Sequence, residues 1–351
     1  MAAKRWPREV HQAVLAARDA LQEHLPGGLR YLVACSGGAD SLALAAIAAE
    51  GVADGWLEGG VGAVIVDHGM QEGSAVAAAE AARACASLGL DPVRVVAVHV
   101  GEEGNEADAR QARYAALEEV RREVGADFVL TAHTASDQAE QVLLALARGS
   151  GTRSLAGIPV RRARVLRPFL DLRREETEAV CLALGLQPWE DPTNAQPVAL
   201  RNRVRHELLP QMREILGQGI DDSLVRTARL AGQDADLLDE LAEQALEAAA
   251  MGESPNVMGV AMDRVDGRAP LVWDLDRTII RDAPAALRSR VLRMAAVAVG
   301  GRAPTAERTS ALERLVSGAG SAGPVQLDGH VSVTRERQAD GRAVVRFRGL
   351  A

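Results

Sequence analysis

The segment Arg30-Tyr-Leu-Val-Ala-Cys35, followed at once by Ser36-Gly-Gly-Ala-Asp-Ser41, decides how this sequence folds. The first six residues predict a short buried strand, and the alanine-rich run after Ser41 predicts a helix to about residue 50. Two glycines let the backbone approach a ligand closely, and N–H groups at the start of a helix attract anions. The segment therefore predicts a phosphate-binding turn, although an ordinary serine-capped turn would have the same pattern.

The alternation of strand and helix continues to about residue 147. The expected strands are 61–67, 93–100 and 128–132, and the expected helices are 7–24, 74–88, 105–124 and 135–147. Strands of near-continuous Val, Ile and Leu between helices indicate an α/β fold with a doubly wound, mostly parallel sheet. Ligands bind beyond the carboxyl ends of such strands, where Ser36–Ser41, Asp67-His68-Gly69 and His133–Asp137 would lie.

Past Arg148 the pattern loosens into a basic turn region, a helix at 173–184 and a connector with three prolines. A second unit begins near 216, with expected helices at 219–250, 283–299 and 304–317 and short strands at 324–348. We therefore predict a catalytic domain at 1–190, a connector at 191–215 and a smaller C-terminal α+β domain at 216–351.

Composition excludes several classes of protein. The basic residues are 39 arginines and one lysine, Lys4, so a Walker A loop and a Schiff-base enzyme are close to excluded. Hydrophobic runs are too short to span a bilayer and the N-terminus lacks a signal peptide, which predicts a cytoplasmic protein without membrane contact. The three cysteines make no disulfide framework and fit a reducing compartment, and no Cys/His spacing suits a structural zinc.

The net charge of −8 argues against a nucleic-acid partner when it is taken alone. The charge is uneven, however, because residues 148–213 carry 12 basic and 7 acidic groups and residues 277–351 carry 13 and 6. Two such basic segments suit contacts to nucleic-acid phosphates, which set affinity rather than sequence choice. Randomly distributed surface charge explains the counts equally well, so both interpretations stay open here.

The Ser36–Ser41 string carries an aspartate, Asp40, which is unusual in a phosphate site unless Mg²⁺ bridges it to phosphate oxygens. The string resembles the PP-loop, S-G-G-x-D-S, of the N-type ATP pyrophosphatases, which cleave ATP between the α- and β-phosphates. The resemblance implies that ATP is bound by the loop residues Ser36, Gly37, Gly38, Ala39, Asp40 and Ser41.

Further blocks between about residues 30 and 215 resemble the tRNA(Ile)-lysidine synthetase family. They are Val66–Gly69, Glu106–Tyr114, Ala132–Glu140, Arg148–Gly151, Arg167-Pro168, Asp191–Asn194 and Arg201–Arg205. That family adenylates the C2 oxygen of the wobble cytidine in an isoleucine tRNA with a CAU anticodon, and the amine of lysine then displaces AMP. The resemblance implies ATP, Mg²⁺, L-lysine and this tRNA as ligands, and leaves a homodimer open.

The expected helix at 105–124 places Glu106, Arg110, Arg113 and Tyr114 on one face. Arginine forks there would hold a phosphate or a carboxylate, and stabilise negative charge as it develops. Solvated Glu–Arg pairing on a surface helix is the alternative.

The block around His133 is expected at the sheet's ligand edge, with His133 and Asp137 four residues apart at a helix start. Asp137 would hold a second Mg²⁺ or the ammonium of lysine, Glu140 would be the other ammonium partner, and His133 would contact the triphosphate or the cytidine. A capping aspartate and a structural histidine are the alternatives. The block departs from the family pattern at three positions, Thr134, Ser136 and Gln141.

Arg201, Arg203 and Arg205 sit at alternate positions, so one helical face cannot hold all three, and one of them is expected to be structural. The catalytic candidates are Asp40, Arg113, His133, Asp137 and Arg205, with Asp40 and Asp137 as metal ligands. Asp67 and His68 join the PP-loop as nucleotide-binding candidates. The candidates for lysine or tRNA binding are Arg110, Glu140, Arg148 and Arg201.

Two rival functions are weighed against this one. Another PP-loop enzyme, such as a thiolase or an amidotransferase partner, is disfavoured because the chain lacks C-x-x-C and has Ala2 where a nucleophilic cysteine would stand. A tRNA-binding protein with a decayed site is disfavoured by the intact Ser36–Ser41 loop, while the departures at Thr134, Ser136 and Gln141 leave it open.

Overall fold

The computed structural model describes residues 7–24, 27–69, 73–98, 106–149, 151–189, 200–252 and 271–349. Contacts within the chain divide it into two compact units, Met1–Leu230 and Ala231–Ala351, which we describe separately. The division falls inside the long helix α10 (Ile220–Ala249) rather than at the expected boundary near 216. A continuous helix gives no compositional break, so the sequence could not place this division. The functional boundaries at 190 and 215 stay a prediction.

The first unit is built on a sheet with the strand order β3-β2-β1-β4-β6-β5 in the described part of the chain. Its strands are β1 (Tyr31–Ala34), β2 (Val61–Asp67), β3 (Val93–Ala97), β4 (Phe128–Leu130), β5 (Arg161–Arg162) and β6 (Val165–Leu166). All neighbours pair in parallel except β5, which runs antiparallel to β6. The predicted doubly wound, mostly parallel α/β fold is confirmed.

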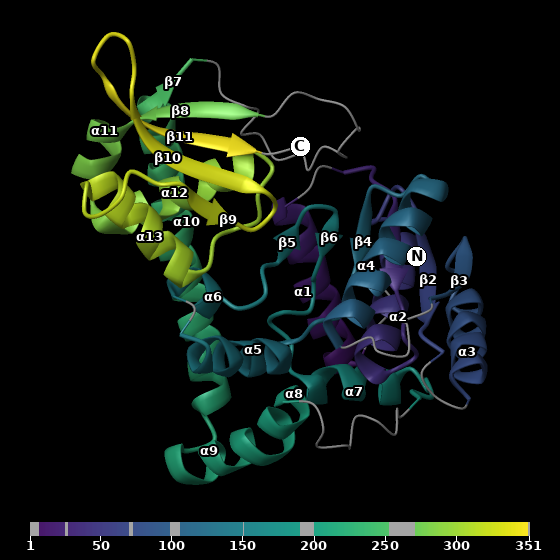
Figure 1. Ribbon diagram of the computed structural model, residues 1–351. Coiled ribbons are helices and arrows are strands. Elements are labelled where there is room, and N and C mark those ends of the chain that lie inside the picture. Colours follow the sequence, from purple (N-terminus) through teal and green to yellow (C-terminus); the bar gives the residue numbers. More distant parts are fainter. Residues whose placement is uncertain are drawn as a thin grey trace. The chain divides into compact units, whose positions relative to one another are not determined.

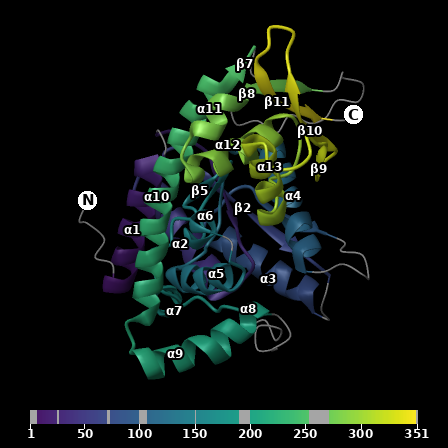
Figure 2. The same ribbon diagram turned by 60° about the vertical axis from the view of Figure 1, so that its left-hand side comes forward.

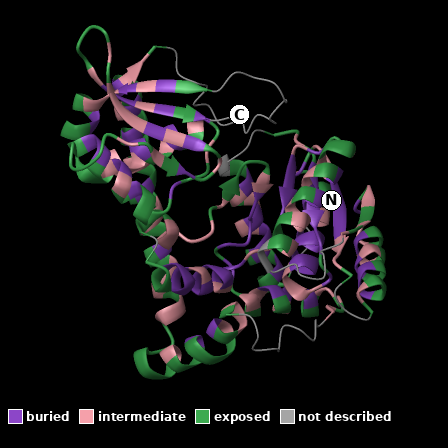
Figure 3. Cartoon of the chain, viewed as in Figure 1, coloured by how far each residue is buried: buried purple, intermediate pink, exposed green. Residues whose placement is uncertain are grey.

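Helices cover both faces of this sheet (Figure 1). The central strand explains why, because Tyr31 and Val33 enter one apolar core while Leu32 and Ala34 enter another. The first core is closed by α1 (Arg8–His24), α2 (Ala39–Ala53), α3 (Ser74–Ser87) and α7 (Arg174–Ala183), and the second by α4 (Glu106–Glu123). The central strands are buried along their length (Figure 3).

The segment after β4 forms α5 (Ala135–Ala147) and a short α6 (Thr152–Leu155), followed by the β5–β6 hairpin. For residues 148–157 we expected a flexible basic turn without α6, and we expected no hairpin after it, because two-residue strands and a four-residue helix are too short to show periodicity. Beyond α7 come α8 (Leu200–Arg203), a π-helix η2 (Val204–Leu208) and α9 (Leu209–Leu216). Leu143 and Leu144 of α5 pack against Val204 and Leu209, which fixes η2 beside α5.

The second unit pairs an antiparallel sheet with packed helices, which include the carboxyl-terminal half of α10 as well as the three named below (Figure 2). The strands are β7 (Ala250–Met251), β8 (Val272–Asp276), β9 (Val325–Leu327), β10 (Val331–Arg337) and β11 (Ala343–Gly349). The helices are α11 (Arg277–Asp282), α12 (Ala285–Ala298) and α13 (Ala306–Ser317). Buried Trp273, Val331 and Phe347 line the core between them. This is the expected α+β unit, to which the structure adds β7, β8 and α11.

Among the described helices, none combines the length and the apolar character that crossing a membrane requires.

Candidate active site

The candidate residues gather at the point in the sheet where the order of successive strands changes direction. The chain moves outward from β1 to β2 and β3, then returns to place β4 on the other side of β1. The carboxyl ends of β1 and β4 therefore flank a topological switch point, the usual ligand site of such sheets. Ser36–Ser41 follow β1, His133 follows β4, and Asp67 and His68 close β2. The sequence prediction that these segments meet at one edge is confirmed.

The loop after β1 is tightly organised around Ser41. The Ser41 hydroxyl accepts a hydrogen bond from the backbone N–H of Ser36 (3.1 Å) and donates to the carbonyl of Gly38 (3.0 Å). Gly37 has φ +86°, and a Cβ there would lie 3.3 Å from Cβ of Ala81, so this position favours glycine. Gly38 offers no side chain to cap α2, so the first-turn N–H groups of the helix are left for an anion.

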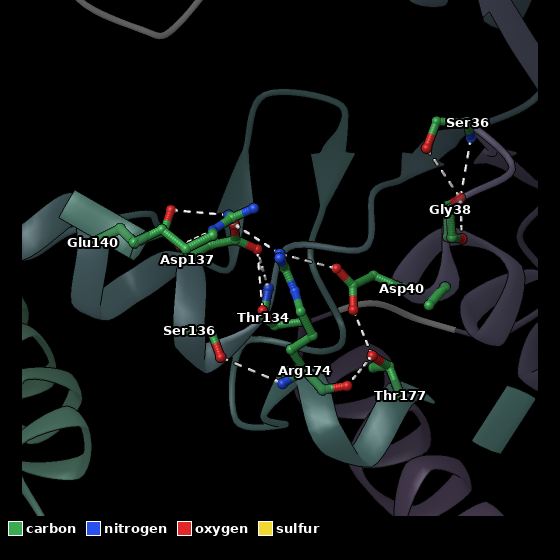
Figure 4. Close-up of polar contacts among 12 residues, drawn as sticks. Ser36, Gly38, Asp40, Thr134, Ser136, Asp137, Glu140, Arg174 and Thr177 are labelled. Atoms are coloured by element: carbon green, nitrogen blue, oxygen red, sulfur yellow. Dashed lines mark hydrogen bonds and ion pairs between the residues drawn. The ribbon is translucent and has the colours of Figure 1, made fainter. Parts of the chain in front are cut away.

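Asp40 lies in the first turn of α2 and faces α7 (Figure 4). Its Oδ2 is 3.3 Å from Nη2 of Arg174, and its Oδ1 is hydrogen-bonded by the hydroxyl of Thr177, which is fully buried. Burial raises the pKa of Asp40 above its ordinary value, while Arg174 and Thr177 act in the opposite direction. The loop carboxylate is thus held by a helix that comes more than 130 residues later in the chain.

Asp137 has two roles at the start of α5. Its Oδ2 accepts hydrogen bonds from the backbone N–H (2.8 Å) and the hydroxyl (3.1 Å) of Thr134, so it caps the helix as the simpler interpretation expected. Its Oδ1 faces the other way, 2.8 Å from Nη2 of Arg201 and 3.9 Å from Nη2 of Arg174. Burial opposes ionisation, but Arg201 and the Thr134 N–H outweigh it and hold the pKa of Asp137 below its ordinary value.

Glu140, one turn further along α5, is 1% exposed and is held by two arginines. Arg201 Nε lies 2.7 Å from its Oε2, and Arg205 places Nε 2.5 Å from Oε1 and Nη2 3.0 Å from Oε2. Arg203 points away and pairs with exposed Glu207 at 3.2 Å. The expectation that the three alternate arginines cannot share one face is therefore confirmed.

A second group of cations lies on the other side of His133. Arg113 of α4 is close enough to His68 that burial and this guanidinium together lower the pKa of His68. Arg167, which follows β6, is 3% exposed, and its Nη1 donates to the carbonyl of Pro159 (2.8 Å). Arg110 stacks on the ring of Tyr114 with its guanidinium carbon 5.1 Å from the ring centre.

His133 lies between the carboxylates and these cations. Its Nδ1 is 3.0 Å from the hydroxyl of Thr131. Burial lowers its pKa to about 3, with Arg167 and Arg113 adding to the effect and Asp137 opposing it. The ring is therefore neutral at physiological pH and serves as a hydrogen-bonding group rather than as a cation.

Three buried nitrogens at this edge have no hydrogen-bond partner, as do a few elsewhere among the described residues, such as Trp56 Nε1 and Trp273 Nε1. Among the described residues, His68 Nδ1, Arg167 Nε and Arg174 Nε are buried and unbonded. Buried polar atoms in native proteins almost always have partners, and a bound ligand commonly supplies the missing ones. Arginine donors and helix N–H groups facing one edge suit a polyphosphate.

Not every predicted residue joins this constellation. Arg148 is exposed at the carboxyl end of α5, the opposite end of the helix from Asp137 and Glu140. The side chain of Glu106 and all of Asp191–Asn194 lie outside the described residues.

The three departures from the family pattern lie in the same part of the site. Two of them have structural roles, since Thr134 caps α5 and the Ser136 hydroxyl accepts the backbone N–H of Arg174 (3.3 Å). The structure offers no role for Gln141.

Sequence reasoning did not select Arg174 and Thr177, and it quoted Arg167 only within a motif. The first two lie on an expected helix with an ordinary Arg-Glu-Glu-Thr start, which carries no signal of its own. Their role depends on the packing of α7 against α2, seen also in the Sγ–H of Cys181 donating to the Ala39 carbonyl (3.3 Å).

No cluster of three or more His, Cys, Asp or Glu that could hold a metal occurs among the described residues. Asp40 and Asp137 instead face one cationic nitrogen, Nη2 of Arg174, from two sides (Figure 4). Two carboxylates around a position occupied by positive charge fit a Mg²⁺ ion that takes its other ligands from phosphates and water.

Comparison with known proteins adds to this geometry. A PP-loop domain model matches residues 12–212, and a TilS substrate binding domain model matches residues 275–349. A tRNA(Ile)-lysidine synthase of Thermobifida fusca is 45% identical over 333 residues, covering 94% of this chain and 95% of the relative. One from Salinispora tropica is 47% identical over 328 residues, covering 91% and 92%.

Among solved structures, a tRNA thiolase, NcsA of Methanococcus maripaludis, has a TM-score of 0.52 at 19% identity. It covers 64% of this chain and 80% of its own, and so supports the fold alone. The two domain models match the two structural units in order, and the named relatives align over nearly the whole chain. On this evidence the chain belongs to the tRNA(Ile)-lysidine synthase family.

Proposed function

We propose that this protein ligates lysine to C2 of the wobble cytidine in isoleucine tRNA with a CAU anticodon. ATP first adenylates the C2 oxygen and releases pyrophosphate, and the lysine amine then displaces AMP to give lysidine. The observation that carries the proposal is the juxtaposition, at one switch point, of a PP-loop and a buried Asp–Glu pair. These are a phosphate site and an ammonium site, the two that this reaction needs.

The nucleotide side of the site is the loop after β1 with its surrounding cations. Free N–H groups at the start of α2 and the hydroxyl of Ser36 would bind the phosphates of ATP. Arg113 and Arg205 would stabilise the negative charge that develops as pyrophosphate leaves. Asp67 Oδ1 accepts the N–H of Gly69 (2.9 Å), which shapes the turn where, with His68, it would meet the nucleotide.

Mg²⁺ is proposed at Asp40 and Asp137, where it would neutralise phosphate charge and orient the leaving pyrophosphate. The residues themselves do the rest of the positioning. Thr177 fixes the rotamer of Asp40, and Thr134 fixes that of Asp137. The neutral ring of His133 would hydrogen-bond the cytosine or a phosphate oxygen without adding charge.

The amine side of the site is Glu140, one turn beyond the proposed Mg²⁺ ligand Asp137 on α5. Glu140 is 1% exposed and is paired with the guanidiniums of Arg201 and Arg205, so its place in the fold is already one for positive charge, and the ammonium of lysine would be such a charge. No general base is needed for adenylation, because the cytosine carbonyl oxygen is already a nucleophile. The lysine amine must lose a proton before it attacks, and no side chain is assigned to that step.

The second unit is proposed to bind the tRNA. Its arginines include a pair, Arg277 and Arg335, whose guanidinium nitrogens lie close to Gly318 at the carboxyl end of α13, where Arg277 Nε also donates to the carbonyl of Val316 (2.6 Å). Burial and the charges of Arg335 and Arg281 lower the pKa of Arg277, so this cluster favours an anion such as a backbone phosphate. Arg110 and Arg148 remain candidate tRNA contacts, and a homodimer and a cytoplasmic location stay predictions.

The rival functions are not favoured. A thiolase needs an accessible sulfur carrier, and Cys35, Cys85 and Cys181 are all buried. A decayed binding protein would not be expected to keep the ordered Ser41 and Asp40 contacts described above.

The test is incorporation of labelled lysine into a CAU-anticodon isoleucine tRNA transcript with ATP and Mg²⁺, measured together with pyrophosphate release. We expect both, in equal amounts, and neither with a methionine tRNA transcript that shares the anticodon. A folded protein that releases no pyrophosphate with the isoleucine transcript would contradict the proposal.

A further inference from the structure

The carboxylates that would bind lysine are already occupied by the protein itself. Glu140 is bridged by Arg201 and Arg205, and Asp137 Oδ1 lies within 2.8 Å of Arg201 and 3.4 Å of Arg205. Two carboxylates thus face two guanidiniums, and the cluster is neutral before any substrate arrives. A lysine ammonium meets no net attraction there and must displace a guanidinium to reach Glu140.

Both arginines come from one short continuous stretch, α8 followed directly by η2, so they can be released together. Arg201 lies in α8 and Arg205 in the π-helix η2, four residues apart and on the same face. Val204 and Leu209 anchor this element to α5, so the long arginine side chains can move while the backbone stays packed. A π-helix inside a helical run frequently marks a functional site.

The cluster is also connected to the nucleotide loop. Arg174 Nη2 lies 3.9 Å from Asp137 and 3.3 Å from Asp40, and its buried Nε has no hydrogen-bond partner among the described residues. Phosphate binding near Asp40 offers acceptors to Arg174, Arg201 and Arg205. Guanidiniums form bidentate pairs with phosphate oxygens just as they do with carboxylate oxygens.

We propose that Arg201 and Arg205 form a clamp that keeps the lysine site closed until nucleotide phosphate draws them away. The inference rests on the proposed function and adds an order of binding to it: lysine binds after the nucleotide. In the free protein the clamp excludes amines from Glu140 and Asp137. With nucleotide bound, the same arginines contact phosphate, Asp137 is left to the proposed Mg²⁺, and the uncovered Glu140 attracts the ammonium of lysine. Arg201, which bridges both carboxylates, is then a positioning residue that sets this order.

The test is equilibrium dialysis of labelled lysine against the full-length protein, alone and with α,β-methylene-ATP, Mg²⁺ and the tRNA transcript. We expect lysine affinity to rise about tenfold or more on loading the wild type, within the range of ordinary coupling between sites. Arg201→Gln should raise the affinity of the unloaded protein toward the loaded value, a gain that structural damage would not produce. Arg203→Gln is the matched control, because its partner Glu207 is exposed, and it should keep the wild-type difference.

The proposal is overturned if the wild type binds lysine equally well with and without nucleotide, or if Arg201→Gln leaves the unloaded affinity unchanged. Circular dichroism checks that the variant folds, and Arg205→Gln provides a second way to open the clamp if it does not. Pyrophosphate release from ATP and tRNA without lysine separates the two proposals. Its absence contradicts the proposed function, whereas release without any effect of nucleotide on lysine binding contradicts only the clamp.

Discussion

His133 makes the first unit sensitive to acid, and replacing it should remove that sensitivity. Burial, reinforced by Arg167 and Arg113 and opposed by Asp137, lowers its pKa from 6.5 to about 3. The unfolded chain therefore takes up this proton near pH 6.5, but the folded chain only near pH 3. Stability from the neutral ring is fully present above pH 6.5 and is lost progressively as the pH falls toward 3.

The size of the effect follows from the two pKa values. At pH 5 the linkage relation gives a loss of about 2 kcal/mol relative to pH 7.5. His133→Asn cannot take up the proton. When the pH is lowered from 7.5 to 5, the opening free energy of the first unit should therefore decrease by about 2 kcal/mol less in the variant than in the wild type. Hydrogen–deuterium exchange of peptides from β4 and α5 at the two pH values, corrected for intrinsic exchange rates, measures this difference.

The control for this experiment is His11→Asn, which removes an exposed histidine from α1 and should keep the wild-type dependence on pH. Carbon-13 NMR of labelled histidine gives an independent check, because the resonance missing in His133→Asn should not titrate between pH 5 and 8 in the wild type. An ordinary titration of that resonance near pH 6.5, or equal pH dependence in both variants, would refute the reasoning.

Three further predictions concern the reaction. Asp40→Ala should abolish pyrophosphate release while the circular dichroism spectrum stays unchanged, and retained turnover would remove Asp40 from the nucleotide site. Thr177→Val deletes the hydrogen bond to Asp40 and should slow pyrophosphate release by about 10- to 100-fold, since such a bond is worth about 1.5–3 kcal/mol; an unchanged rate would show that the rotamer needs no support. Replacing Arg277 and Arg335 together by alanine should weaken tRNA binding and reduce the salt dependence of log K by about 1–2. Filter binding across a salt series measures this, and an unchanged slope would place the tRNA elsewhere.

The parallel sheet could be predicted because hydrophobic pattern and burial agree along its central strands. Strand β2 has the predicted bounds, Val61–Asp67, and all of its first five residues are buried. The hairpin of β5 and β6 could not be predicted in the same way. Its strands have two residues each, and exposed Arg161 and Arg162 give β5 a polar pattern typical of a loop.

The site residues also fall into a predictable group and an unpredictable group. Residues that follow strands were predictable, because the carboxyl ends of parallel strands meet at one edge whatever the helices do. Arg174 and Thr177 reach Asp40 only because α7 packs on α2, and no local pattern reports that packing. For Arg201, Arg203 and Arg205, spacing predicted that one face cannot hold all three, but which of them meet Glu140 depended on the contact between η2 and α5.

At positions 201 and 205, the choice of arginine rather than lysine has a physical reason. A guanidinium can span two carboxylates at once, as Arg201 does with Nε on Glu140 and Nη2 on Asp137. An ammonium is a compact point charge and would occupy the same subsite as the substrate. An internal lysine here would therefore compete with the substrate for one position, whereas arginines cover the carboxylates from outside and retain a strong preference for phosphate. The chemistry of the clamp thus favours arginine whatever codon usage the genome imposes.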